Sequence, residues 1–232
     1  MQEILQGLSA GFHLLLAGDA EVWGTTARSL VFSGSATAIA ALAAVPFGIW
    51  IAVGPVPARR RIVAALYAGM GKPTVLVGLV LTMLLWRAGP LGRLGLLFTP
   101  PAVVLGQIAI AFPMVAGLSH AAVAALERRV VLQIRALGAS GRQAAWLLAV
   151  EARRGIIVAL LAGFGHAFSE VGAAMMLGGN LAGETRVLTT ATVLAARMGR
   201  FDLAIGLGAL LFAIALLVNG SVVALQPRAP LP

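Results

Sequence analysis

The sequence predicts an all-α polytopic membrane protein with about five transmembrane helices. Of its 232 residues, 60% are hydrophobic and only 11% are charged, whereas a soluble domain carries about 25% charged residues. Uncharged stretches longer than the roughly 20 apolar residues needed to cross a bilayer cover residues 29–58, 94–126 and 203–227. These stretches are continuously apolar rather than alternating, which argues against a transmembrane β-barrel.

Residues 1–28 are expected to form an extracytoplasmic or interfacial segment, and residues 29–232 a single transmembrane domain. The apolar run that ends at Leu16 is too short to span a bilayer. Asp19 is a suitable N-cap for a further helix that leads into the membrane. No basic segment followed by an apolar core and a cleavage site is visible, so no cleavable signal peptide is expected.

The first two spans are expected over about residues 29–53 and 62–86. The second contains Lys72 directly before Pro73. In an unbroken helix Lys72 lies near the bilayer midplane, where a lysine is costly and indicates function. Alternatively, the helix starts late or breaks at Pro73, and the Lys72 side chain snorkels to the inner interface.

Three further spans are expected over about residues 100–124, 155–177 and 201–225. Between the third and fourth lies a segment, residues 127–154, that is helically patterned but too charged to cross a bilayer. Gly138 divides this segment into two short helices, and Ser140 is a suitable N-cap for the second. Such a pair can lie on the membrane surface and present its turn to a partner.

The distribution of arginines predicts that the N-terminus is outside and the C-terminus inside. Five spans place ten arginines on one side of the membrane and six on the other, and cytoplasmic loops carry the excess of basic residues. The ten are Arg59, Arg60, Arg61, Arg128, Arg129, Arg135, Arg142, Arg153, Arg154 and Arg228, and the six are Arg28, Arg87, Arg93, Arg186, Arg197 and Arg200. The segment 127–154 is therefore expected in the cytoplasm.

Composition and spacing also exclude several classes of site. The net charge of +9 is explained by arginines at membrane boundaries, so no nucleic-acid partner is expected. There is no cysteine, and no cluster of His, Asp and Glu has metal-ligand spacing, so no metal site is expected. Residues 69–72 resemble the end of a phosphate-binding loop, but Leu66 stands where the first glycine of that motif belongs and Pro73 where its Ser or Thr belongs. The chain itself is therefore not expected to bind ATP.

An enzymatic alternative comes from Gly138-Ala139-Ser140-Gly141, which matches the short serine motif of rhomboid-type intramembrane proteases. Such a protease needs its serine within the bilayer and a histidine on a neighbouring helix, whereas this motif lies among arginines. We therefore assign no catalytic residue, and an intramembrane hydrolase that uses Ser140 is kept as the alternative of another class.

The turn of the cytoplasmic segment, Arg135-Ala136-Leu137-Gly138-Ala139-Ser140, resembles the second part of the EAA coupling motif of ABC importer permeases. Leu132-Gln133-Ile134 replaces the Glu-Ala-Ala of that motif, and Val150-Glu151 replaces its closing Leu-Pro, which argues against a general sugar or amino-acid permease. Four other stretches resemble permeases of the tungstate and molybdate branch: residues 73–79, 89–92, 169–180 and 185–190.

This resemblance implies a type I importer permease fold, and a transport subunit rather than an enzyme, in a prokaryotic inner membrane. Two copies would pair with two ABC ATPase subunits, which bind ATP and magnesium, and would receive an oxyanion from an extracytoplasmic binding protein. Tungstate is the expected substrate, with molybdate, sulfate or vanadate as alternatives, and it would pass along the homodimer interface. Residues 135–140 would couple the chain to the ATPase.

Lys72 and Glu170 are the two candidates for a pathway or gating role. Lys72 departs from the family pattern, so its role is particular to this sequence. Glu170 is expected in the outer half of the fourth span. Because a carboxylate repels a dianion, Glu170 is expected either to pair with an arginine, to cap a broken helix near Gly172, or to act in gating rather than to bind substrate.

Overall fold

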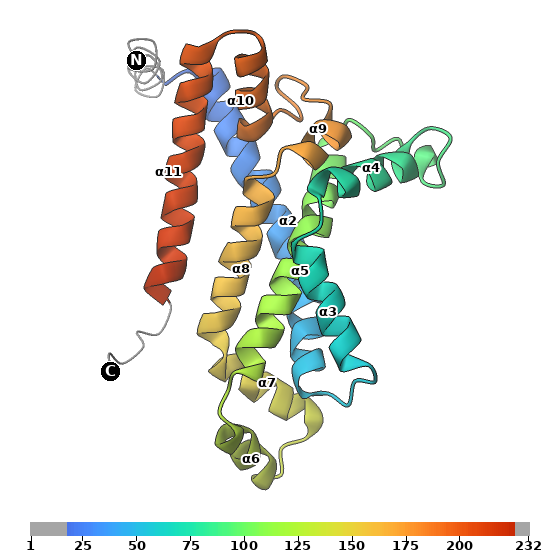
Figure 1. The fold of residues 1–232 in the computed structure, drawn as a ribbon, viewed down its shortest axis with the longest axis vertical. Helices are drawn as coiled ribbons and strands as arrows, with labels where there is room; N and C mark the ends of the chain where they lie inside the picture. Colours follow the sequence, from blue (N-terminus) through green and yellow to red (C-terminus); the bar gives the residue numbers. More distant parts are fainter. Residues whose placement is uncertain (1–17, 226–232) are drawn as a thin grey trace.

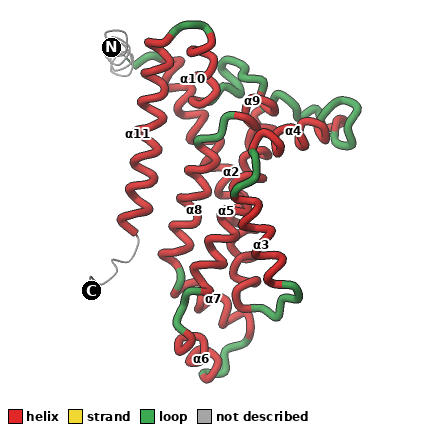
Figure 2. The backbone as a smooth tube through the Cα atoms, in the orientation of Figure 1, coloured by secondary structure: helices red, strands yellow, loops and turns green. Residues whose placement is uncertain are grey.

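The computed structural model describes residues 18–225, and these residues contain helices but no strand (Figures 1 and 2). The elements are α2 Ala20–Val53, α3 Arg59–Met70, α4 Thr74–Leu85, the short 3₁₀ helix η1 Gly92–Leu94, α5 Pro100–Ala124, α6 Arg128–Ala136, α7 Gly141–Glu151, α8 Arg153–Phe168, α9 Gly172–Gly178, α10 Leu188–Arg197 and α11 Phe201–Leu225. The predicted all-α class is confirmed. The apolar run ending at Leu16, and Arg228, lie outside the described residues.

Three helices of the described chain are long and apolar enough to cross a membrane, and the number rises to five if each of two bent helix pairs is counted as one span. The three helices are α2, α5 and α11, and the bent pairs are α3 with α4 and α8 with α9. The chain passes up and down through these segments, with α6 and α7 at one end of the molecule and α10 at the other (Figure 1). The predicted number of about five spans is confirmed on this basis.

The first span begins earlier than predicted, because α2 starts at Ala20 rather than near Ser29. Asp19 caps it as expected: its Oδ1 accepts a hydrogen bond of 2.9 Å from the Val22 amide. Asn, Asp and Ser are preferred at this position because their side chains satisfy one of the free amides of the first turn. Residues 20–28 therefore belong to the same helix as the first predicted span.

The second and fourth spans are broken, which corrects the prediction of one continuous helix in each. The axis bends by 97° between α3 and α4 and by 61° between α8 and α9. The first break contains Gly71 and Pro73, and proline removes a helix amide and clashes with the preceding turn. The second break spans residues 169–171, where hydrogen bonds from side chains take over from the helix ladder.

α10 was not predicted, because residues 178–200 were expected to form an outer loop. This helix has ten residues, with Thr189 and Thr190 at its start, and is too short and too polar to resemble a span. It packs against α11 and forms the end of the molecule opposite α6 and α7 (Figure 1).

The core of the bundle is the contact between α2 and α5, which run side by side along most of their length (Figures 1 and 2). Ala36, Ala40 and Ala44 of α2 are at most 1% exposed. A Cβ atom at Gly48 would lie only 2.4 Å from the Ala116 carbonyl oxygen. Small residues at such positions let helices in a membrane approach closely, so this pair forms a rigid centre on which α3 and α8 also pack.

Candidate functional sites

The turn between α6 and α7 is built as the sequence predicted. Gly138 adopts a φ of +76°, a left-handed conformation that glycine enters without steric cost. Ser140 caps α7 in a reciprocal arrangement: its Oγ accepts from the Gln143 amide, and its own amide donates to Gln143 Oε1 at 2.8 Å. The two short helices and the serine cap are therefore confirmed.

This helix pair is fastened to the bundle by a buried apolar cluster with Leu148 at its centre. Leu148 of α7 is 1% exposed and packs with Ile49 near the end of α2 and Val123 near the end of α5. A cavity of about 420 Å³ lies between the turn and these two helix ends, with Ala139 among its lining residues. A movement of the turn can thus reach the ends of α2 and α5 through the Leu148 contact.

The outward surface of the same pair carries two large apolar side chains that nothing in the described chain covers. Leu137, at the tip of the turn, is 85% exposed, and Trp146 of α7 is 70% exposed. Ala136, Gly138 and Ser140 are exposed as well. An exposed apolar turn of this kind is suited to insertion into a groove of another protein subunit.

The same geometry bears on the hydrolase alternative. The Ser140 hydroxyl is used as a helix cap, at the end of the molecule where α6 and α7 lie (Figure 1). Within residues 18–225 its hydrogen-bond partner is the Gln143 amide, so the hydroxyl has a structural use in the turn.

Glu170 lies in the break between α8 and α9 and is only 5% exposed. Its Oε1 accepts a hydrogen bond of 2.7 Å from the Ala173 amide in the first turn of α9. The two ion pairs of the described chain lie elsewhere, at Glu127 with Arg129 and at Glu21 with Arg186. Of the two structural roles expected for Glu170, the structure therefore has capping of a broken helix and not pairing with an arginine.

Lys72 lies in the other break, and its Nζ donates to the carbonyl oxygens of Gly69 at 3.2 Å and Ala109 at 3.0 Å. Ala109 is the tenth residue of the 25-residue helix α5, and the α6–α7 pair contacts the far end of α5, at Val123. The break that one of the two alternatives assumed is present, whereas the position of Lys72 relative to the inner interface stays a prediction. The ammonium group is bound partway along the bundle.

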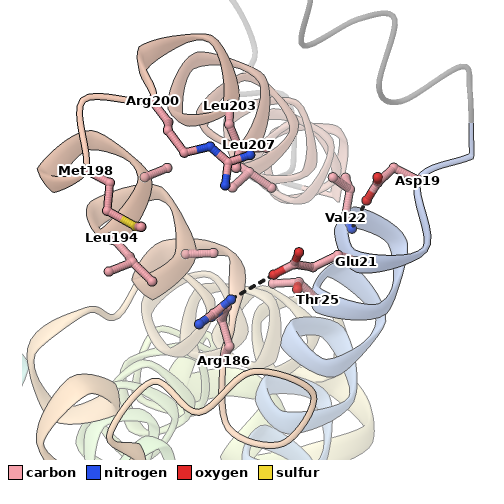
Figure 3. Close-up of a pocket in the computed structure, with 12 residues that line it drawn as sticks. Asp19, Glu21, Val22, Thr25, Arg186, Leu194, Met198, Arg200, Leu203 and Leu207 are labelled. Atoms are coloured by element: carbon pink, nitrogen blue, oxygen red, sulfur yellow. Dashed lines mark hydrogen bonds and ion pairs between the residues drawn. The ribbon is translucent and has the colours of Figure 1, made fainter.

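At the end opposite α6 and α7, the start of α2 is tied to the loop before α10. Arg186 and Glu21 form an ion pair with 2.7 Å between Nη1 and Oε1 (Figure 3). Arg28 donates to the carbonyl oxygens of Arg186 at 3.2 Å and Gly183 at 3.4 Å. Sequence reasoning counted these arginines only as topology signals. Because Glu21 and Arg186 are 165 residues apart, no local spacing could have paired them.

A cavity of about 290 Å³ lies beside this tie, between α2, α10 and α11 (Figure 3). Arg186 and Arg200 line it, but Asp19 and Glu21 line it too. Two guanidinium groups and two carboxylates leave no net charge to attract an anion. Within residues 18–225 no group of three or more His, Asp or Glu side chains could hold a metal ion.

Comparison with known proteins identifies a family over most of the chain. The family model for the binding-protein-dependent transport system inner membrane component matches residues 44–229. A tungstate uptake system permease protein, TupB, of Peptoclostridium acidaminophilum is 35% identical over 226 residues, covering 97% of this chain and 99% of that protein. A probable anion ABC transporter permease protein of Haloferax volcanii is 38% identical over 210 residues, covering 88% and 90%.

Solved structures agree at the level of the fold. The MetNI methionine ABC transporter in an inward-facing conformation contains a chain that superposes with a TM-score of 0.66. The match covers 89% of this chain and 95% of that one, at 16% sequence identity. The predicted type I importer permease fold is confirmed by this likeness together with the family match.

Proposed function

Because the chain belongs to the family of binding-protein-dependent transport system inner membrane components, we propose that it is the permease of an ATP-driven importer for tungstate. Membership makes it a multi-pass membrane protein and a transport component rather than an enzyme. The choice of tungstate as substrate rests on the 35% identity to a tungstate uptake permease over nearly the full length of both chains. Molybdate, sulfate and vanadate remain the alternative oxyanions.

In the proposed assembly, the α6–α7 pair is cytoplasmic and docks on an ABC ATPase subunit. The support is the exposed apolar tip at Leu137 and the buried attachment through Leu148. Closure of the ATPase dimer would displace the turn at residues 135–140, and Leu148 would transmit that displacement to α2 and α5. ATP and magnesium are held by the partner and not by this chain.

The opposite end, with α10 and the Arg186–Glu21 ion pair, would then face the extracytoplasmic binding protein. Two copies of the chain would form a homodimer, with the oxyanion moving between them. Lys72 and Glu170 would act at the two helix breaks beside this route. Hydroxyls and backbone amides, rather than the Glu170 carboxylate, are suited to contact a dianion.

The experiment that tests this function is reconstitution of the complete transporter. The chain would be expressed with the ATPase encoded beside it, purified, and placed in liposomes with the cognate binding protein. ATP hydrolysis is then measured with the binding protein empty or loaded with tungstate, molybdate or sulfate. We expect stimulation by the tungstate-loaded protein alone.

Two results would contradict the proposal at different levels. Stimulation by loaded molybdate or sulfate, with none by tungstate, would retain the importer and replace the substrate. Failure of the chain to retain any ATPase through purification, under conditions in which it is inserted and folded, would remove the coupling role of residues 135–140.

A further inference from the structure

The two carbonyl groups that bind Lys72 share one property: each is four residues before a proline. The Gly69 carbonyl precedes Pro73, and the Ala109 carbonyl precedes Pro113. In an α-helix the carbonyl of residue i accepts from the amide of residue i+4. Proline has no amide hydrogen. Pro113 lies inside α5 and deprives the Ala109 carbonyl of its helical donor. The Gly69 carbonyl lies in the last turn of α3, which ends at Met70 before Pro73, so it has no helical donor either. Lys72 therefore donates to two carbonyls that lack helical donors.

The chemistry of this contact suits the interior of a membrane. Away from water an unsatisfied backbone carbonyl costs several kcal/mol, so each proline creates an acceptor that needs a donor from elsewhere. An ammonium group has three N–H donors, and hydrogen bonds from a charged donor are stronger than neutral ones. No carboxylate of the described chain lies within ion-pair distance of Lys72, and its ammonium group binds carbonyl oxygens instead.

The contact also adds a polar tie between two helices that already pack on each other, α3 and α5. Gly69 belongs to the last turn of α3, and Ala109 lies in α5. The surfaces already touch here, since a Cβ atom at Gly69 would lie 3.0 Å from the Pro113 Cβ. The ammonium therefore fixes the end of α3 against α5 at the place where the chain bends by 97° into α4.

The direction of α4 in turn sets its packing against the second break. A Cβ atom at Gly78 of α4 would lie 2.7 Å from the Ala173 Cα of α9, and one at Gly172 would lie 2.6 Å from Val75. Gly172 opens α9, next to the turn that Glu170 caps. A change in the α3–α4 angle would move α4 directly against the start of α9.

We propose that Lys72 is a positioning residue that locks the α3–α4 break to α5 by bridging two carbonyls without helical amide donors, one at the end of α3 and one opposite Pro113 in α5. The lock itself does not depend on which anion is carried. Its consequence for transport rests on the proposed function, so the primary measurements below are structural.

The first measurement is the distance between the two arms of the bend. The chain contains no cysteine, so spin labels can be placed at Tyr67→Cys in α3 and Met83→Cys in α4, whose native side chains are 47% and 64% exposed. We expect a narrow distance distribution with Lys72, a broad one with Lys72→Met, and a narrow one again with Lys72→Arg, which restores the charged donors.

The second measurement tests the role of the prolines by a double-mutant cycle. Pro113→Ala returns an amide donor to the Ala109 carbonyl, so one of the two contacts of Lys72 becomes redundant. Lys72→Met should lower the midpoint of thermal unfolding by about 5 °C in the native background. The shift should be about half as large in the Pro113→Ala background.

The outcomes separate clearly. Unchanged width of the distance distribution in Lys72→Met, or an equal shift with and without Pro113, would overturn the proposal. If Lys72→Met cannot be recovered from membranes, two other variants decide. Lys72→Arg must then be recovered at the native level, and Pro113→Ala must raise the recovery of Lys72→Met. Failure of either condition overturns the proposal. Loss of uptake with a normal distance distribution would implicate Lys72 in transport by another route and would also overturn the lock.

Discussion

Glu170 and Lys72 are charged side chains at the two helix breaks, and each is bound to backbone groups that a broken helix leaves without partners. Glu170 accepts from the Ala173 amide at the start of α9, and Lys72 donates to two carbonyls. Both charges therefore have a structural use at sites where an uncompensated charge is expensive. A transport role for either residue has to be separated from this use by experiment.

For Glu170, a comparison of two variants, Glu170→Gln and Glu170→Ala, separates the structural role from a role in transport. The glutamine keeps a carbonyl oxygen that can accept from the Ala173 amide and removes only the charge, whereas alanine removes the acceptor. We expect Glu170→Gln to retain stability and uptake, and Glu170→Ala to lose about 1–3 kcal/mol in the free energy of unfolding. Thermal unfolding in detergent and uptake in liposomes measure the two effects.

A different pattern would assign gating to the carboxylate. If Glu170→Gln is as stable as the native chain but fails to transport, the negative charge itself is required. Glu170 is 5% exposed, so a loss of this kind could not be ascribed to a changed surface.

Among the elements, the α6–α7 pair divides its residues between attachment and presentation. Leu148 faces the bundle and is almost completely buried, while Leu137 extends from the turn into solvent. Gly138 makes the change of direction between them possible, because its φ of +76° is strained for residues with a side chain. Attachment and docking are thus carried by different leucines and can be removed one at a time.

This division predicts opposite phenotypes for two matched substitutions. Leu148→Ala should cost about 2–5 kcal/mol by leaving a cavity beside Ile49 and Val123. Leu137→Ala should change stability by less than about 0.5 kcal/mol, as is usual for an exposed site, but weaken retention of the ATPase. Thermal unfolding of the purified chain and co-purification with the ATPase provide the measurements.

Equal retention of the ATPase by Leu137→Ala and the native chain would argue that the turn is not the docking surface. Trp146→Ala, at the second exposed apolar position of the pair, shows in the same assay whether the contact extends along α7.

The bounds of the helices show which elements could be predicted from the sequence alone. The third and fifth spans have the predicted bounds, 100–124 and 201–225, because their apolar runs are uninterrupted and a proline pair or a loop marks the start. The second and fourth spans are also largely apolar, and hydropathy does not distinguish a straight helix from a bent one. The turn between α6 and α7 was predictable from Gly138 and Ser140, since both act through local geometry.

The hydrogen-bond partners of Lys72 could be predicted from the sequence only in part. Counting four residues back from Pro73 and Pro113 identifies Gly69 and Ala109 as carbonyls without helical donors. What the sequence could not provide is that α3 and α5 bring these two carbonyls to the same place. The Arg186–Glu21 ion pair could not be predicted for the same reason, because it depends on tertiary packing between residues 165 positions apart.

For the whole molecule, the proposed orientation with the N-terminus outside can be tested by cysteine labelling. Leu137→Cys in the turn and Leu181→Cys in the loop before α10 introduce single thiols at positions that are 85% and 43% exposed, in a chain without native cysteine. A membrane-impermeant reagent added to intact cells should label residue 181 and leave residue 137 unlabelled. Permeabilisation should expose both.

Labelling of residue 137 in intact cells would reverse the orientation and place the ATPase contact elsewhere. Reaction of both positions in sealed cells would mean that the two ends of the bundle do not lie on opposite sides of the membrane.

α2 gives the molecule a mechanical property that neither end has by itself. It is a single helix of 34 residues, about 51 Å long at 1.5 Å per residue. One end packs on Leu148 of the α6–α7 pair, and the other is tied through Arg28 and Ser29 to the loop and start of α10. α2 thus connects the two ends of the bundle as a single helix, so a displacement of one end is carried directly to the other. The delay between movements at the two ends would then depend on the stiffness of α2 rather than on successive rearrangements of side chains.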